Sequence, residues 1–172
     1  ALISAQIKKN EEVIIPDLSY VSAANSVKYL GAVPIFVDIE TDNYSICPKK
    51  LEVYIKRICV KKNGFLLNKN TGRYIKALIL VHVFGYTGNI IKIKKLCKKY
   101  NLVFIEDSSE CLGSFFKKKH LGTFGDFGVL SFNGNKIITT GGGGAVICNS
   151  KKNYKLLKHI SANSKINHKW KF

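Results

Sequence analysis

The chain has 172 residues, 46% of them hydrophobic, which is enough for one domain with a sizeable core. Its net charge is +17, but arginine occurs only at Arg57 and Arg73. Nucleic-acid sites depend on arginine for bidentate contacts, so the lysines predict a solvated surface and no specific nucleic-acid partner, with weak non-specific binding at low salt left open. No apolar run is long enough to cross a bilayer and the first residues lack a signal-peptide pattern, so we expect no membrane association.

The first half of the chain alternates short apolar strands with helices. The expected elements are a helix tail at Ala1–Lys9, strands at Val13–Ile15 and Pro34–Asp38, a helix at Val21–Tyr29 capped by Gly31, an extended Tyr44–Ile46 and a helix from Pro48 to Val60. The polar residues 61–73 predict an exposed hairpin or loop.

The second half continues this alternation. The expected elements are a central strand at Lys76–Val83, a loop at Gly85–Asn89, a helix at Ile90–Tyr100, a strand at Leu102–Ile105 followed by Glu106 and Asp107, a loop or hairpin at Phe115–Leu121, strands at Val129–Phe132 and Ala145–Cys148, and a helix at Lys151–Ser161. Alternating helices and strands that are apolar on both faces predict an α/β domain with a mostly parallel central sheet flanked by helices. Ligands of such sheets bind beyond the carboxyl ends of the strands, which here lie near Tyr20, His82, Asp107 and the loop of Lys136.

One lysine, Lys136, differs from the others in its surroundings. It follows Asn-Gly-Asn, precedes Ile-Ile-Thr-Thr and lies between two predicted strands, whereas most lysines here stand beside other lysines. We therefore expect a tight loop that holds it against the core. Partial burial favours the neutral amine that Schiff-base chemistry requires.

Four further side chains could act with this lysine. Asp107 directly follows an apolar strand and could pair with a cationic ring nitrogen, cap the next turn or bind a ribose hydroxyl. Ser131 could hold a phosphate or be an ordinary serine at a strand end. Tyr20 could cover a planar cofactor or lie in the core, and Glu110 could be a surface acid. Together with Lys136 they match what pyridoxal phosphate needs, namely an amine, a carboxylate for the pyridine nitrogen, an aromatic face and a hydroxyl for the phosphate.

The run Gly141–Gly144 suggests a phosphate-binding loop, but it lacks the GxGxxG and GxxxxGK[ST] spacings. We interpret it as a turn that lets the backbone pass close to the Lys136 loop. The five cysteines form no CxxC pair, which predicts buried or unused thiols in a reducing compartment, a cytoplasmic location and no metal site. The chain contains no methionine, and Ala1–Gln6 looks like the middle of an amphipathic helix, so we expect a fragment cut at both ends.

Five segments occur in an order that is typical of one enzyme family. They are Ile15–Tyr20, Leu30–Asp38, Val81–Gly85, Ile105–Ser114 and Ser131–Gly141. This order resembles the DegT/DnrJ/StrS-type sugar aminotransferases, pyridoxal-phosphate enzymes of fold type I. The resemblance covers essentially the whole chain. It implies that residues 1–172 are part of the large cofactor-binding domain, without an N-terminal segment and the C-terminal small domain.

The resemblance also implies a role for each candidate residue. Lys136 matches the lysine that forms an imine with the cofactor and moves the proton, and Asp107 matches the acid that pairs with the pyridine nitrogen. Glu110 matches a position near the ring hydroxyl, Ser131 a phosphate ligand and Tyr20 the stacking aromatic. Family members with histidine in place of the lysine catalyse dehydration, so Lys136 argues for amino transfer. The family's Gly-Thr phosphate turn is absent here, which leaves the cofactor site incomplete.

Finer features indicate a substrate class. The insert 61–73, the Asn-Gly-Asn-Lys-Ile-Ile run and the tail Ile166–Trp170 resemble the branch that aminates C4 of UDP-linked 4-keto-6-deoxy-N-acetylhexosamines for surface polysaccharide, such as lipopolysaccharide, or glycan. Perosamine synthases, which act on a GDP-linked 4-keto sugar, are a near neighbour. By resemblance the amino donor is L-glutamate, and the enzyme is a homodimer.

Three other interpretations stay open. A nucleotide- or NAD-binding α/β domain without transaminase activity could place Asp107 or Asp38 on a ribose, but it predicts a glycine fingerprint that is missing. A basic polymer-binding protein predicts DNA binding that weakens steeply with salt. The third is a truncated, non-catalytic product.

Overall fold

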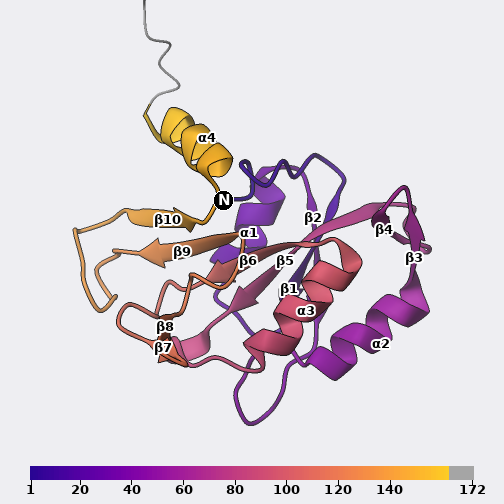
Figure 1. Ribbon diagram of the computed structural model, residues 1–172, viewed down its shortest axis with the longest axis horizontal. Helices are drawn as coiled ribbons and strands as arrows, with labels where there is room; N and C mark the ends of the chain where they lie inside the picture. The colour runs from indigo at the N-terminus through magenta and orange to yellow at the C-terminus, as the bar shows by residue number, and fades with distance from the viewer. Residues whose placement is uncertain (163–172) are drawn as a thin grey trace, which may run out of the picture.

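The computed structural model describes residues 1–162 of the chain, and an eight-stranded sheet forms its centre (Figure 1). Its strands are β1 (Glu12–Pro16), β2 (Val33–Val37), β3 (Cys59–Lys62), β4 (Phe65–Asn68), β5 (Tyr74–Val81), β6 (Val103–Asp107), β9 (Phe127–Ser131) and β10 (Gly144–Cys148). The order is β10-β9-β6-β5-β1-β2, with the β3-β4 hairpin attached to β5. Strands β2, β1, β5, β6 and β9 are mutually parallel, whereas β10 and the hairpin are antiparallel to their neighbours. The predicted mostly parallel sheet is therefore confirmed.

Helices cover both faces of this sheet. They are α1 (Ser22–Tyr29), α2 (Pro48–Ile58), α3 (Ile90–Tyr100) and α4 (Lys151–Ser161). Helices α2 and α3 lie side by side on one face, and α4 lies against β10 at the sheet edge (Figure 1). On β5, Leu78 and Leu80 pack against α2 and α3, whereas Ala77 and Ile79 pack with α1 and the first residues of the chain. Burial of both faces explains the continuous apolar run that predicted a central strand.

Local signals explain where the helices end. The Asn89 side chain accepts a hydrogen bond from the Lys92 amide at 3.1 Å and caps the start of α3. Asn101 ends that helix in the left-handed conformation, with φ +54°. Gly31, at φ +67°, follows the end of α1 as expected. Across residues 1–162, no helix has the length and apolar character needed to span a bilayer.

Several expected boundaries are wrong. Ala1–Lys9 forms hydrogen-bonded turns rather than a helix. Tyr44 is left-handed, at φ +56°, and of the expected extended segment only Ile46 pairs, in an isolated antiparallel bridge with Ile39. Helix α2 ends at Ile58 instead of Val60, because the next residues begin β3.

The expected hairpin in residues 61–73 is present, but it starts at Cys59 and extends the sheet through β4. The fully buried Glu12 stabilises the position of this hairpin. Its carboxylate accepts hydrogen bonds from Asn68 Nδ2 at 2.9 Å and from Thr71 Oγ1 at 2.7 Å. A second hairpin joins β7 (Phe115–Phe116) to β8 (Lys119–His120), as expected. The tail Ile166–Trp170 lies outside the described residues.

Candidate active site

The candidate residues gather at the carboxyl edge of the parallel strands. Asp107 is the last residue of β6 and Ser131 the last of β9, while Tyr20 follows β1. All five candidates line one cavity of about 680 Å³: Tyr20, Asp107, Glu110, Ser131 and Lys136. That volume lies in the range of small-molecule sites. Parallel pairing accounts for the gathering, because it brings the ends of β1, β5, β6 and β9 to the same side of the sheet.

Lys136 lies on the irregular segment between β9 and β10, and its side chain is only 17% exposed. Its Nζ is 3.2 Å from Glu110 Oε1, so the two side chains form an ion pair at the cavity wall. The other oxygen of Glu110, Oε2, accepts the Phe84 amide hydrogen bond at 2.8 Å. Glu110 therefore joins the amine to the backbone that follows β5.

Asp107 uses one carboxylate oxygen within the protein. Its Oδ1 accepts hydrogen bonds from the Ser109 amide at 3.2 Å and from Ser109 Oγ at 2.5 Å, which is the turn-capping role considered above. Among residues 1–162, no hydrogen bond reaches Oδ2. Asp107 can thus cap the turn with Oδ1 and offer Oδ2 to a cationic group in the cavity.

Within the described part of the chain, the hydroxyl of Ser131 makes one long hydrogen bond, which it accepts from the Asn133 amide at 3.4 Å, and it remains able to donate. Tyr20 is 81% exposed at the cavity rim, so the alternative of a core aromatic is wrong for this residue. Phe84, which sequence reasoning did not single out, is a second exposed aromatic of this cavity.

The glycine run also borders the cavity. Gly143, at φ +102°, lines it, and a Cβ on Gly144 would lie only 2.5 Å from the Leu130 carbonyl oxygen. The backbone of this run thus passes close to β9, whereas the approach to the Lys136 loop that the sequence suggested stays a prediction. A smaller cavity of about 590 Å³ adjoins on the α1 side and shares Asp107 and Ser131 as lining residues.

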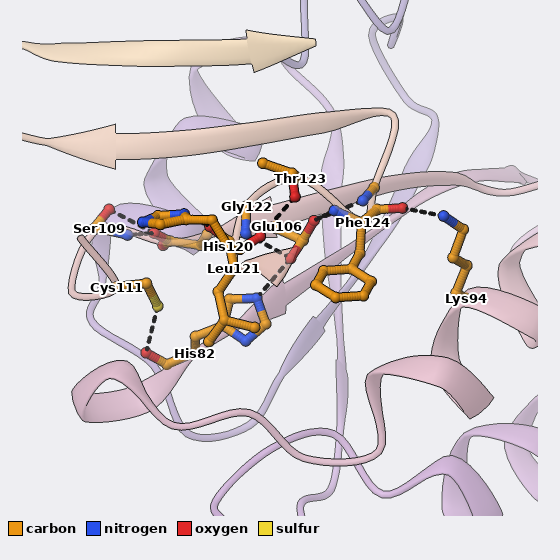
Figure 2. Close-up of polar contacts among 12 residues, drawn as sticks. His82, Lys94, Glu106, Ser109, Cys111, His120, Leu121, Gly122, Thr123 and Phe124 are labelled. Carbon is orange, nitrogen blue, oxygen red and sulfur yellow. Dashed lines mark hydrogen bonds and ion pairs between the residues drawn. The ribbon is translucent and has the colours of Figure 1, made fainter. Parts of the chain in front are cut away.

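Glu106 has a buried carboxylate whose role sequence reasoning did not identify (Figure 2). Its side chain is fully buried and accepts hydrogen bonds from His82 Nε2 at 2.9 Å and from the amides of Gly122 at 2.8 Å, Phe124 at 2.6 Å and Gly125 at 2.6 Å. Burial alone would raise the pKa of this carboxyl, but the hydrogen bonds from His82, Gly122 and Gly125 outweigh it and hold the pKa below its usual value. A glutamate within an apolar strand signals such a network, because a buried charge needs partners.

The groups around the larger cavity fit pyridoxal phosphate. An amine on Lys136, an unused oxygen on Asp107, a hydroxyl on Ser131 and an aromatic ring on Tyr20 are the groups that this cofactor requires.

Comparison with known proteins gives the family context. Residues 1–172 match the profile of the DegT/DnrJ/EryC1/StrS aminotransferase family. The chain is 39% identical over 160 residues to a GDP-perosamine synthase of Escherichia coli O157:H7, covering 93% of this chain and 40% of that protein. It is 36% identical over 149 residues to a GDP-perosamine synthase of Caulobacter vibrioides, covering 87% and 36% respectively. The chain thus spans about two fifths of the length of these relatives.

Solved structures share the fold. An aminotransferase of this family from Brucella abortus superposes with a TM-score of 0.85 and 26% identity, covering 99% of this chain and 43% of that one. Helicobacter pylori PseC, an aminotransferase involved in the biosynthesis of pseudoaminic acid, gives a TM-score of 0.81 and 28% identity, covering 98% and 42%. Bacillus subtilis NtdA, solved with the bound cofactor PMP, gives 0.75 and 27%, covering 93% and 32%. The predicted fold type I architecture is confirmed.

Proposed function

The chain belongs to the DegT/DnrJ/EryC1/StrS aminotransferase family, and from this premise we propose that it is part of a pyridoxal-phosphate-dependent enzyme that transfers an amino group to a nucleotide-linked keto sugar. One observation carries the proposal: Lys136 and Asp107, which come from different strand ends, line the same cavity. An amine and a carboxylate on one cavity are what this cofactor needs at opposite ends of its ring system.

Bound pyridoxal phosphate supplies an electron-accepting ring that stabilises negative charge on the reacting carbon. We propose that Asp107 Oδ2 holds the protonated ring nitrogen, because Oδ1 is already used by Ser109. Ser131 donates its hydroxyl to the phosphate, and Tyr20 covers the ring face. Lys136 Nζ holds the cofactor and moves the proton at the reacting carbon.

Glu110 has a supporting part in this proposal. Its carboxylate contacts the Lys136 amine at 3.2 Å and is itself held by the Phe84 amide at 2.8 Å. Because both carboxylate oxygens of Glu110 have partners, the directions in which the Lys136 side chain can point are restricted. Glu110 therefore orients the amine toward the cavity and offers an acceptor for a proton on it.

For the substrate we propose a nucleotide-linked 4-keto-6-deoxy sugar that is aminated at C4, with L-glutamate as the amino donor and surface polysaccharide or glycan as the destination. The names of two relatives, both GDP-perosamine synthases, support a GDP-linked sugar. The UDP-linked sugar indicated by the sequence is the second candidate. Direct competition between the GDP-linked and the UDP-linked sugar as substrates distinguishes the two candidates.

The remaining expectations belong to the same proposal. We propose that residues 1–172 form part of the large cofactor-binding domain of a longer, cytoplasmic, homodimeric enzyme. This chain covers about two fifths of the length of its relatives, which supports the proposal of a longer enzyme. We expect neither a membrane nor a specific nucleic acid among its partners.

The test uses the full-length enzyme incubated with L-glutamate and either GDP- or UDP-linked 4-keto-6-deoxy sugar. Formation of 2-oxoglutarate and of the 4-amino sugar is followed by mass spectrometry. We expect turnover with one of the two sugars and none in Lys136→Ala, whereas the exposed surface variant Lys151→Ala keeps the wild-type rate. A Lys136→Ala enzyme with wild-type turnover would refute the proposal.

A further inference from the structure

The buried carboxylate of Glu106 connects separate segments that carry the candidate site. Its Oε2 accepts hydrogen bonds from His82 Nε2 and the Gly122 amide, and its Oε1 accepts from the amides of Phe124 and Gly125. Figure 2 shows His82, Gly122 and Phe124 converging on the Glu106 side chain. An ionised carboxylate only accepts hydrogen bonds, so all four donors are satisfied by a single residue.

Each donor segment leads directly to part of the cavity. His82 precedes the backbone that carries Phe84, the residue bound by Glu110. The loop at residues 122–125 leads into β9, which ends at Ser131 and continues to Lys136. Glu106 itself precedes Asp107 in β6.

Neighbouring strand residues point to opposite faces, which places the carboxylate behind the cavity rather than in it. Phe104, two residues before Glu106, belongs to the core under α2 and α3, whereas Ile105 packs in the core on the α1 side. Asp107 then faces the cavity, while Glu106 is absent from its lining. Glu106 can therefore act on the site only through the backbone segments that it binds and through His82, which lines the cavity.

The loop at residues 122–125, called the glycine loop because it contains Gly122 and Gly125, packs tightly against the neighbouring strands. A Cβ on Gly122 would lie 2.8 Å from Ser108 Oγ, and one on Gly125 would lie 2.6 Å from the Phe104 carbonyl oxygen. Beside it, the Ser108 amide donates to the Val129 carbonyl at 2.9 Å. The loop therefore has little freedom to move relative to β6 and β9 while the carboxylate holds it.

We propose that Glu106, together with His82, is a positioning residue for the amino-transfer site: it fixes the segments that carry Asp107, Glu110 and Lys136 relative to one another. The proposal rests on the function proposed above. It assigns to Glu106 an effect on catalysis that goes beyond fold stability, although the side chain touches no reacting group.

The test compares Glu106→Gln with Glu12→Gln in the full-length enzyme. Glutamine keeps the volume but turns one oxygen into an NH₂ group, which in either orientation faces at least one backbone N–H donor instead of accepting from it. Glu12 is a matched control, because it is equally buried, accepts hydrogen bonds from Asn68 and Thr71, and lies at the opposite end of the sheet from the cavity.

We expect Glu106→Gln to lower kcat about tenfold or more with little change in KM, since small displacements of catalytic groups have large effects on rate. Its bound-cofactor absorbance should also shift. Glu12→Gln should lower the thermal midpoint while kcat and the absorbance stay at wild-type values. Equal kcat and absorbance in the two variants would overturn the proposal.

Amide hydrogen exchange of the cofactor-free protein gives a second readout that does not depend on the enzyme's activity. Glu106→Gln should speed exchange in residues 107–110 as well as in the 122–125 loop, whereas Glu12→Gln should leave both unchanged. If only the loop responds, the positioning role is refuted even if the chain proves to have another function. If wild-type enzyme neither binds the cofactor nor transfers an amino group, the proposed function fails instead.

Variants of His82 cover the case in which Glu106→Gln does not fold. His82→Leu removes one donor and leaves the three backbone donors in place, whereas His82→Gln retains an N–H. We expect kcat to fall in the leucine variant and to be largely restored in the glutamine variant. Wild-type kcat in both would contradict the proposal.

Discussion

The amine of Lys136 and the carboxylate of Glu110 form a 3.2 Å ion pair in the wall of the cavity that Asp107 also lines. The two residues are 26 positions apart in sequence and belong to different segments. The backbone after β5 takes part in this pair, because the Phe84 amide binds the second oxygen of Glu110. The orientation of the proposed catalytic lysine therefore depends on three segments.

Replacing Glu110 should disturb the lysine without unfolding the protein. We expect Glu110→Ala to lower kcat about tenfold, because the amine loses its fixed partner. Glu110→Gln should be milder, since its remaining carbonyl oxygen still accepts one hydrogen bond. Steady-state kinetics on the full-length enzyme measures both, and equal rates for Glu110→Ala and wild type would show that the ion pair does not orient the amine.

Acid should destabilise the fold partly through Glu106. Its pKa in the folded state lies below the ordinary value of 4.5 for a glutamate, so the unfolded chain binds the proton first as the pH falls. The stability from this carboxylate is complete above about pH 5 and is lost as pH falls through the lowered folded-state pKa. Denaturant unfolding between about pH 5 and 3 should therefore show a flatter pH dependence in Glu106→Gln than in wild type. Parallel curves would contradict the assignment.

A methyl group on Gly122 should be costly. Gly122 has φ +91°, and its Cβ would lie 2.8 Å from Ser108 Oγ, so Gly122→Ala combines backbone strain with a clash. We expect the free energy of unfolding to fall by about 1–3 kcal/mol. Gly134 has open space around its Cβ position and no positive φ, and Gly134→Ala should stay within about 0.5 kcal/mol of wild type. Urea unfolding measures both, and equal effects would refute the structural distinction.

Thiol labelling of the native protein should be selective. Cys148 is half-buried, whereas the other cysteines are buried: Cys47, Cys59, Cys97 and Cys111. Burial raises the pKa of Cys111 and Cys97 to about 12 and that of Cys59 to about 11, so little thiolate forms at those positions. Iodoacetamide at pH 8 should label Cys148 first, and Cys148→Ser should remove that fast phase. Rapid labelling of Cys111 in the native protein would contradict the described packing.

Regular periodicity made helices α3 and α4 easy to predict from the sequence. The bounds of α3 and α4 are those expected, because apolar spacing and terminal Asn or Ser residues agree there. The end of α2 was misjudged, since Cys59 and Val60 fit a helical pattern yet pair with β4. That pairing is decided by the hairpin and not by local sequence preference.

The gathering of the candidate residues was also predictable, because it follows from parallel strands ending at one edge. The role of Glu106 was not. Its backbone partners lie 16 to 19 residues further along the chain, and only the packing of the glycine loop brings them to the carboxylate. The Lys136–Glu110 ion pair has the same origin, since the loop between β9 and β10 has no regular pattern from which its path could be derived.

The central claim is tested most directly by reducing the full-length enzyme with borohydride in the presence of pyridoxal phosphate and mapping the modified peptide. The account predicts that the cofactor becomes attached to Lys136, and that an Asp107→Ala variant loses most of the visible absorbance of the bound cofactor. Attachment mainly to other lysines, or an unaltered spectrum in Asp107→Ala, would contradict it.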